Sequence, residues 1–71
     1  MLTVVAAMVP GQRYRVTHRG YGVVVGRLVS REPAGLWLVL RVEECDEDRT
    51  DRRSGEALGM NGAMVTAVAA C

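Results

Sequence analysis

The side chains that could bind a metal ion or carry out catalysis are few and far apart in this sequence. Two cysteines, Cys45 and Cys71, form no CxxC pair, and His18 is the one histidine. A structural zinc ion is held by a tetrahedral set of Cys and His ligands, which one copy of this chain cannot assemble. We therefore predict no metal or other cofactor, and we expect both cysteines to be free thiols.

Acidic side chains gather in one stretch, but not at the spacing of a cation site. The residues concerned are Glu43, Glu44, Asp46, Glu47 and Asp48. A calcium loop needs a central glycine and a terminal bidentate glutamate at set positions, and this stretch does not have that spacing. Arginines are mixed with these acids, so a solvated loop is expected over 45–55. No nucleophile, base and oxyanion site come together, so we predict neither an enzyme nor a small-molecule substrate.

The charge balance limits how the chain could bind a polyanion. Nine arginines and no lysine stand against eight acidic residues, for a formal charge of +1. Such a chain does not hold nucleic acid by bulk charge, so any nucleic-acid site must be local. Arg13, Arg15 and Arg19 alternate with less polar residues and could follow a phosphate backbone, although this alternation is also typical of an exposed strand. His18 could contact phosphate, but a lone histidine is more often a hydrogen-bonded or surface residue.

Alternating polar and apolar residues predict three strands in the first part of the chain. They cover residues 12–19, 23–31 and 36–44, and turns containing Gly or Pro separate them. The residues expected on the apolar faces of the first and third strands are Tyr14, Val16, His18, Leu36, Leu38, Leu40 and Val42. Gly26 interrupts the second strand, where it marks a bulge, a bend or a close backbone approach.

The sequence predicts shorter elements of secondary structure near the two ends of the chain. Asn61-Gly62 separates two apolar pieces and is the dipeptide most common in hairpin turns whose residues both need positive φ, so two short strands are expected around it. Residues 1–9 fit either a helix capped by Thr3 or a valine-rich strand, and we favour a short helix. One domain over 1–71 with a core of small side chains is expected, and self-association would add stability.

Two groups of residues resemble the motifs of the Sm and Sm-like family. The order of its first motif is followed by GQRYRV, Gly20, Gly26-Arg27-Leu28, Glu32 and LWLVLRVEE. Met60 to Val68 is similar to its second motif, (I/M)-R-G-x-x-V-x-x-(I/V). The resemblance implies an all-β fold, a strongly bent five-stranded antiparallel small barrel with a short N-terminal helix. It also implies a homo-oligomeric ring of about five to eight subunits that binds single-stranded RNA.

The same resemblance implies which residues contact RNA. Trp37 stands where the family has an Asn that holds a base, and Asn61 stands where it has an Arg that packs beside it. A tryptophan can stack a base instead, for about 1 to 3 kcal/mol, or it can fill a subunit interface. The expected RNA-binding residues are Trp37, Asn61, Gly62, Glu32 and His18. Uridine-rich RNA is the first ligand to test, by analogy with the family.

A second resemblance leaves other functions open. Val16, His18, Tyr21 and Gly22 match the VxHxx(F/Y)G opening of Tudor-like barrels, and WLVLRV resembles a strand of CarD-type domains that dock on RNA polymerase. The alternatives to RNA binding are therefore a protein-docking module and a purely structural ring without nucleic acid. The apolar opening segment lacks a basic leader and is shorter than the roughly 20 residues that span a bilayer, so a cytoplasmic protein without a membrane partner is expected.

Overall fold

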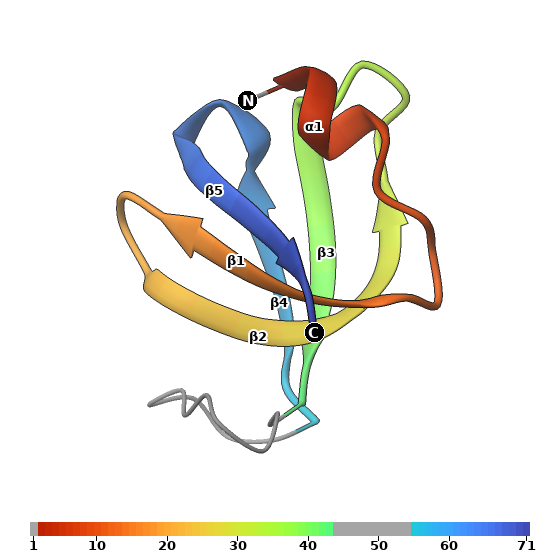
Figure 1. The fold of residues 1–71 in the computed structure, drawn as a ribbon, viewed down its shortest axis with the longest axis vertical. Coiled ribbons are helices and arrows are strands. Elements are labelled where there is room, and N and C mark those ends of the chain that lie inside the picture. The colour runs from red at the N-terminus through yellow and green to blue at the C-terminus, as the bar shows by residue number, and fades with distance from the viewer. Residues whose placement is uncertain (1, 44–54) are drawn as a thin grey trace.

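The computed structural model describes residues 2–43 and 55–71 as one bent sheet with a short helix (Figure 1). In chain order the elements are α1 (Leu2–Ala6), β1 (Arg13–His18), β2 (Gly22–Arg31), β3 (Trp37–Val42), β4 (Ala57–Asn61), the 3₁₀ helix η1 (Gly62–Met64) and β5 (Val65–Ala70). The predicted all-β fold with five antiparallel strands is confirmed, as is a short N-terminal helix. The helix is shorter than the range 1–9 predicted for it.

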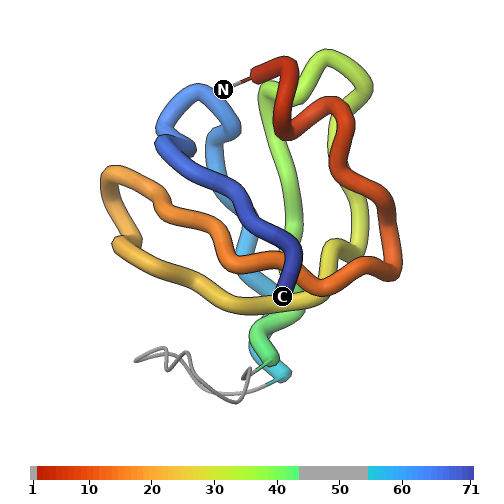
Figure 2. Tube along the Cα trace, in the orientation of Figure 1, coloured from red at the N-terminus to blue at the C-terminus, as the bar shows by residue number. Residues whose placement is uncertain are grey.

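The five strands lie in the order β4-β3-β2-β1-β5, and every neighbouring pair is antiparallel. The long strand β2 curves across the molecule between β1 and β3 (Figures 1 and 2). Since β4 and β5 do not pair with each other, the sheet is open, and only in a loose sense is it the barrel that the resemblance implies. Each of these two strands therefore has one edge without a partner strand in the described part of the chain.

Gly26 pairs with Val42 of β3, and the backbone of β3 leaves no room for a side chain at this position. A Cβ at this residue would lie 2.6 Å from the carbonyl oxygen of Arg41. A close backbone approach, one of the roles predicted for Gly26, is therefore confirmed. The break in the register of β2 and β3 lies further along, between Leu28 and Ser30.

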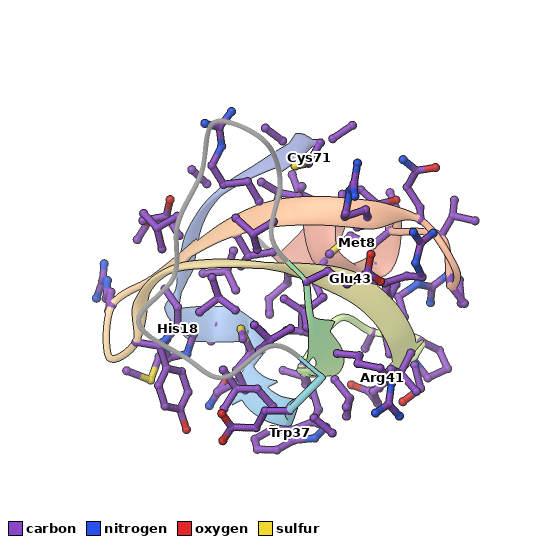
Figure 3. The ribbon with its side chains drawn as sticks, turned by 90° about the horizontal axis from the view of Figure 1, so that it is seen from below. Met8, His18, Trp37, Arg41, Glu43 and Cys71 are labelled. Atoms are coloured by element: carbon purple, nitrogen blue, oxygen red, sulfur yellow. The ribbon has the colours of Figure 1, made fainter. Side chains whose placement is uncertain are left out.

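One face of the sheet forms the core. Its fully buried side chains include Val16, Val24, Leu28, Leu38, Leu40, Val42 and Met60. Burying a valine or leucine side chain contributes about 1.5 to 3 kcal/mol, so the alternation on β1 and β3 accounts for much of the fold. Val5 of α1 and Met8 after it join this core, and Met8 lies near the centre of Figure 3. The prediction for Leu36 is wrong, because this residue precedes β3 and is 52% exposed.

The connection between β4 and β5 differs from the predicted turn. Neither Asn61 nor Gly62 has a positive φ, and three residues of 3₁₀ helix replace a two-residue turn. Asn61 has a φ of −76° and caps η1, because its side-chain oxygen accepts a hydrogen bond from the Ala63 N–H at 2.8 Å. Gly62 is required for space instead, since a Cβ there would overlap the carbonyl oxygen of Gly35.

The prediction that Cys71 is a free thiol is also wrong, because this residue is disulfide-bonded. Its N–H donates a hydrogen bond to the carbonyl oxygen of Arg13 at 3.2 Å, which continues the pairing of β5 with β1. The end of the chain is therefore held in place where fraying is the usual outcome. Cys45 and the acidic residues from Glu44 to Asp51 lie outside the described residues.

Candidate functional site

One cavity gathers three of the residues that the sequence singles out for RNA binding. We call it the Trp37 cavity; its volume is about 320 Å³, and it is lined by His18, Gly20, Tyr21, Trp37, Asn61 and Met64. These residues come from the end of β1 and the turn after it, from the start of β3, and from the end of β4 and η1. His18 and Trp37, which are both labelled in Figure 3, line this cavity together. The sheet thus brings distant parts of the sequence to one site.

Trp37 is placed by the pairing of β3 with β4. It lies directly opposite Asn61 in the register of these strands, so both side chains project from the same face of the sheet. Gly59, two residues before Asn61, makes room for the indole, since a Cβ there would lie 2.7 Å from Trp37 Cζ2. The side chain remains 49% exposed. An aromatic face is therefore held at the cavity without being absorbed into the core.

The side-chain amide of Asn61 uses its oxygen in a hydrogen bond within the fold, but not its NH₂ group among the described residues. Its oxygen accepts the hydrogen bond that caps η1, so the cap fixes the direction of the side chain. Its NH₂ group has no hydrogen bond among the described residues. A donor next to an exposed indole is the kind of polar group that orients a ligand in a largely apolar site.

His18 is buried, being 4% exposed, and its ring holds the turn between β1 and β2 in place. Nδ1 accepts hydrogen bonds from the N–H groups of Gly20 and Tyr21, at 3.0 and 3.2 Å. Because Nδ1 accepts, the ring proton is assigned to Nε2, which is buried and has no hydrogen-bond partner within residues 2–43 and 55–71. The ring also contacts that of Tyr21, with centroids 4.9 Å apart. His18 is therefore a hydrogen-bonded structural residue, and it also lines the Trp37 cavity.

The other two expected RNA-binding residues do not line the cavity. Gly62 is buried behind Asn61, and its N–H donates to the carbonyl oxygen of Leu36 at 2.9 Å. Glu32 uses both carboxylate oxygens within its own turn, where each accepts a hydrogen bond at 3.0 Å, from the N–H groups of Ala34 and Leu36. Both residues therefore support the segments that carry Trp37 and Asn61.

Sequence reasoning did not select three lining residues, Gly20, Tyr21 and Met64. Tyr21 carries the clearest signal that could have identified it, because a large aromatic residue lies between two glycines of a turn. Of the two family resemblances, only the Tudor-like one includes Tyr21. Met64 enters the site because η1 replaces the expected tight turn, which no local signal indicated.

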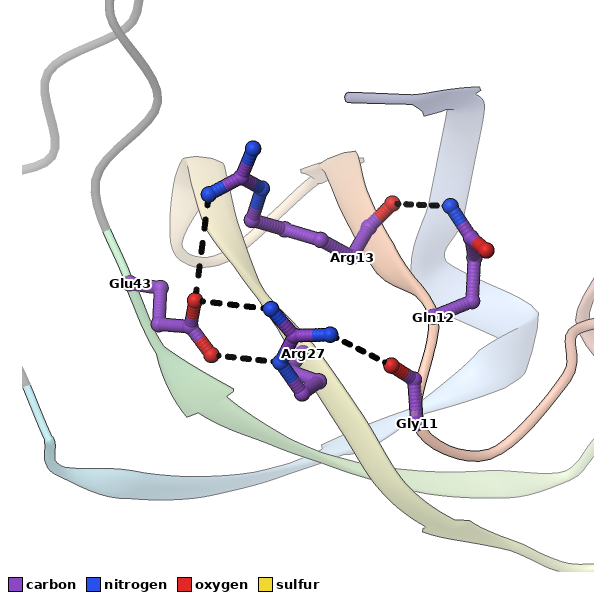
Figure 4. Close-up of polar contacts among 5 residues, drawn as sticks. All are labelled: Gly11, Gln12, Arg13, Arg27 and Glu43. Carbon is purple, nitrogen blue, oxygen red and sulfur yellow. Dashed lines mark hydrogen bonds and ion pairs between the residues drawn. The ribbon is translucent and has the colours of Figure 1, made fainter.

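Arg13 and Arg27, on the outer face of β1 and β2, make polar contacts within the protein (Figure 4). Arg27 donates to both oxygens of Glu43, at 2.8 and 3.3 Å, and to the carbonyl oxygen of Gly11 at 2.6 Å. Arg13 lies 3.8 Å from the same carboxylate. The hydrogen bond between Arg27 and Glu43 raises the pKa of Arg27 and lowers the pKa of Glu43. This face is therefore a weaker candidate for phosphate than its arginine content indicates.

A second cavity, of about 240 Å³, lies between α1 and β5 and is lined by Val4, Ala7, Met8, Tyr14, Val68 and Ala70. Its one side-chain polar group, the Tyr14 hydroxyl, accepts a hydrogen bond from the Val9 N–H at 2.8 Å. The lining offers little else to orient a ligand. The Trp37 cavity is therefore the stronger candidate site.

Residues 2–43 and 55–71 contain neither a metal-binding cluster nor a membrane-spanning helix. No group of three or more His, Cys, Asp or Glu side chains is placed to hold a metal ion. No helix in this part of the chain has the length and apolar character to cross a membrane. Comparison with known proteins adds no relative: no family model, no curated protein and no solved structure matches the chain.

Proposed function

We propose that this chain is an Sm-like RNA-binding protein that forms a homo-oligomeric ring and binds single-stranded RNA at the Trp37 cavity. The observation that carries the proposal is the pairing of Trp37 with Asn61 across two strands at one cavity. These are the two positions that the family resemblance assigns to base recognition. The residues differ from the family's own, but the resemblance implies that these two positions lie close together, and Trp37 and Asn61 do lie opposite each other.

The chemistry of the cavity suits one unpaired base. A half-exposed indole offers a flat apolar surface, and stacking on such a surface tolerates any base at about 1 to 3 kcal/mol each. The NH₂ group of Asn61, which has no partner in the described part of the chain, can donate to a carbonyl oxygen or a ring nitrogen of that base. A volume of about 320 Å³ is at the small end of ligand sites, which favours a single base over a larger ligand.

The outer edges of β4 and β5, which have no partner strand among the described residues, support assembly into a ring. The edge of β5 in one copy can pair with the edge of β4 in the next, a head-to-tail contact that closes when the rotation allows it. β2 has partners on both sides, so it offers no edge to a neighbour. The exposed residues of β5 are small, and an unpaired edge of this kind favours aggregation. Several cavities on one ring of about five to eight copies would bind one RNA with useful avidity.

The proposal is tested by fluorescence anisotropy of a labelled uridine-rich oligonucleotide, at about 50 mM salt where electrostatic contacts are strong. We expect the wild type to bind and Trp37→Ala to bind about 5-fold or more weakly, the lower end of a lost stacking contact. Leu36→Ala is the matched control, because Leu36 is equally exposed and adjacent but does not line the cavity. Unchanged binding by Trp37→Ala would reject this site.

Native mass spectrometry tests the ring, and a mass equal to one chain would overturn it. The two measurements together also separate the alternatives. A monomer that binds no RNA would favour the protein-docking module, and a ring that binds no RNA would favour the purely structural reading.

A further inference from the structure

We propose that the turn between β1 and β2 forms the second wall of the base site, with Tyr21 stacking on the base held at Trp37 and His18 acting as the positioning residue for Tyr21. This inference rests on the proposed RNA binding and deepens it. The first of the two motifs that point to RNA includes Gly20 of this turn, but neither motif includes Tyr21. The cavity does include it.

Tyr21 lies in the turn between β1 and β2 and is partly exposed to solvent. Its side chain is 41% exposed, although it lines the same cavity as Trp37. Gly22, which follows it, has a φ of +73°, so the chain reverses direction at this point. Two half-exposed aromatic side chains on one cavity of this size form a site for a flat ring, because a flat ring can contact both.

His18 holds Tyr21 in two ways. Nδ1 accepts the N–H of Tyr21 at 3.2 Å, which fixes the backbone of that residue, and the two rings contact at 4.9 Å with 35° between their planes. Because His18 is buried in the sheet, it provides a rigid support for an exposed aromatic. A surface held ready before binding loses less entropy when the ligand arrives.

The turn is also tied to the Asn61 side of the cavity. The N–H of Arg19 donates to the carbonyl oxygen of Met64 at 2.9 Å, which joins the end of β1 to η1. The two walls of the cavity are therefore connected by backbone and do not depend on side-chain contacts alone. Arg19 is exposed and lies between the lining residues His18 and Gly20 in the sequence, and an arginine can donate hydrogen bonds to a phosphate.

The experiment measures binding of the same labelled uridine-rich oligonucleotide by variants of Tyr21 and His18 in the full chain. We expect Tyr21→Ala to bind about 5-fold or more weakly, as for loss of one stacking partner. Tyr21→Phe keeps the ring and should bind within about 2-fold of the wild type, since stacking does not need the hydroxyl. Val23→Ala is the matched control, because Val23 is an exposed apolar residue of the same hairpin that does not line the cavity.

A double-mutant cycle tests the positioning role of His18. If His18 acts through Tyr21, then His18→Ala weakens binding in the wild-type background but not in the Tyr21→Ala background. A purely structural histidine would weaken both equally, which would overturn the positioning role. Should Trp37→Ala weaken binding while Tyr21→Ala does not, the second wall is rejected and the RNA-binding function stands. If the wild type does not bind, both proposals fail.

Discussion

The Gly59→Ala substitution adds a single methyl group. We expect it to disturb the proposed site while leaving the stability of the fold nearly unchanged. A Cβ on this residue would lie 2.7 Å from Trp37 Cζ2 and 3.3 Å from Nε1. Carbon atoms pack at about 3.5 to 4.0 Å, so in the Gly59→Ala variant the indole must move by about 1 Å. The obstacle is the far end of a half-exposed side chain, and it is free to swing outward. We therefore expect Gly59→Ala to lower the RNA affinity more than it lowers the free energy of unfolding.

The expected stability change of Gly59→Ala is small because two effects oppose each other. Holding the indole off its preferred rotamer costs about 0.5 to 1.5 kcal/mol. Alanine restricts the unfolded chain more than glycine does, which returns about 0.4 to 1 kcal/mol, and Gly59 has no positive φ that alanine would resist. The free energy of unfolding should change by less than about 1 kcal/mol. RNA affinity should show much of the loss expected for Trp37→Ala.

Gly62→Ala is the matched control, because its obstacle is backbone instead of a side chain. The new Cβ would overlap the carbonyl oxygen of Gly35, which cannot rotate away. Overpacking of this kind costs about 1 to 3 kcal/mol, and the upper end is expected here. Urea denaturation followed by circular dichroism measures both variants without relying on Trp37 as the probe. If Gly59→Ala left both the emission spectrum of Trp37 and the RNA affinity unchanged, the contact between Gly59 and the indole would be refuted.

Three further predictions follow from the polar contacts and from Cys71. The pKa of Glu43 is lowered from 4.5 by its hydrogen bond with Arg27, so the folded state binds fewer protons here, and the stabilisation is full above 4.5 and lost as pH falls through the lowered pKa. In low salt, the free energy of unfolding of Glu43→Gln should therefore depend less on pH in the acid range than that of the wild type. An unchanged pH dependence would contradict this. Glu32→Gln should lose about 1 kcal/mol of stability with unchanged RNA affinity, and weaker RNA binding would return Glu32 to the site. Cys71 should resist alkylation in the unfolded, unreduced protein, whereas labelling followed by mass spectrometry would detect a free thiol.

The alternation of residues predicts the core strands well, because the side-chain period of a strand decides which residues face the core. Leu38, Leu40 and Val42 are buried and Arg41 is exposed, as that period requires. The same rule fails for Leu36, because the strand begins one residue later. Periodicity identifies a face reliably, but it does not locate the residue at which a strand starts.

The parts of the site that the sequence could not predict depend on contacts between distant segments. Asn61-Gly62 looks like a tight turn, but the glycine is required by the carbonyl oxygen of Gly35, which no local pattern indicates. Tyr21 joins Trp37 only because β1 to β4 fold into one bent sheet. The resemblance pointed to Trp37 and Asn61 as neighbours, and their register pairing agrees with that expectation. Glu32 was selected by motif position, whereas its hydrogen bonds lie within its own turn.

The most direct test of the central claim is nuclear magnetic resonance of the isotope-labelled wild type during titration with a uridine-rich oligonucleotide. Trp37 is the only tryptophan in the chain, so its indole N–H gives a single, unambiguous signal. We predict that this signal and those of the Asn61 side-chain NH₂ group and the Tyr21 amide shift together and saturably. Shifts confined to residues of the second cavity, such as Val4 and Ala7, or no shift at Trp37 at all, would contradict RNA binding at the Trp37 cavity.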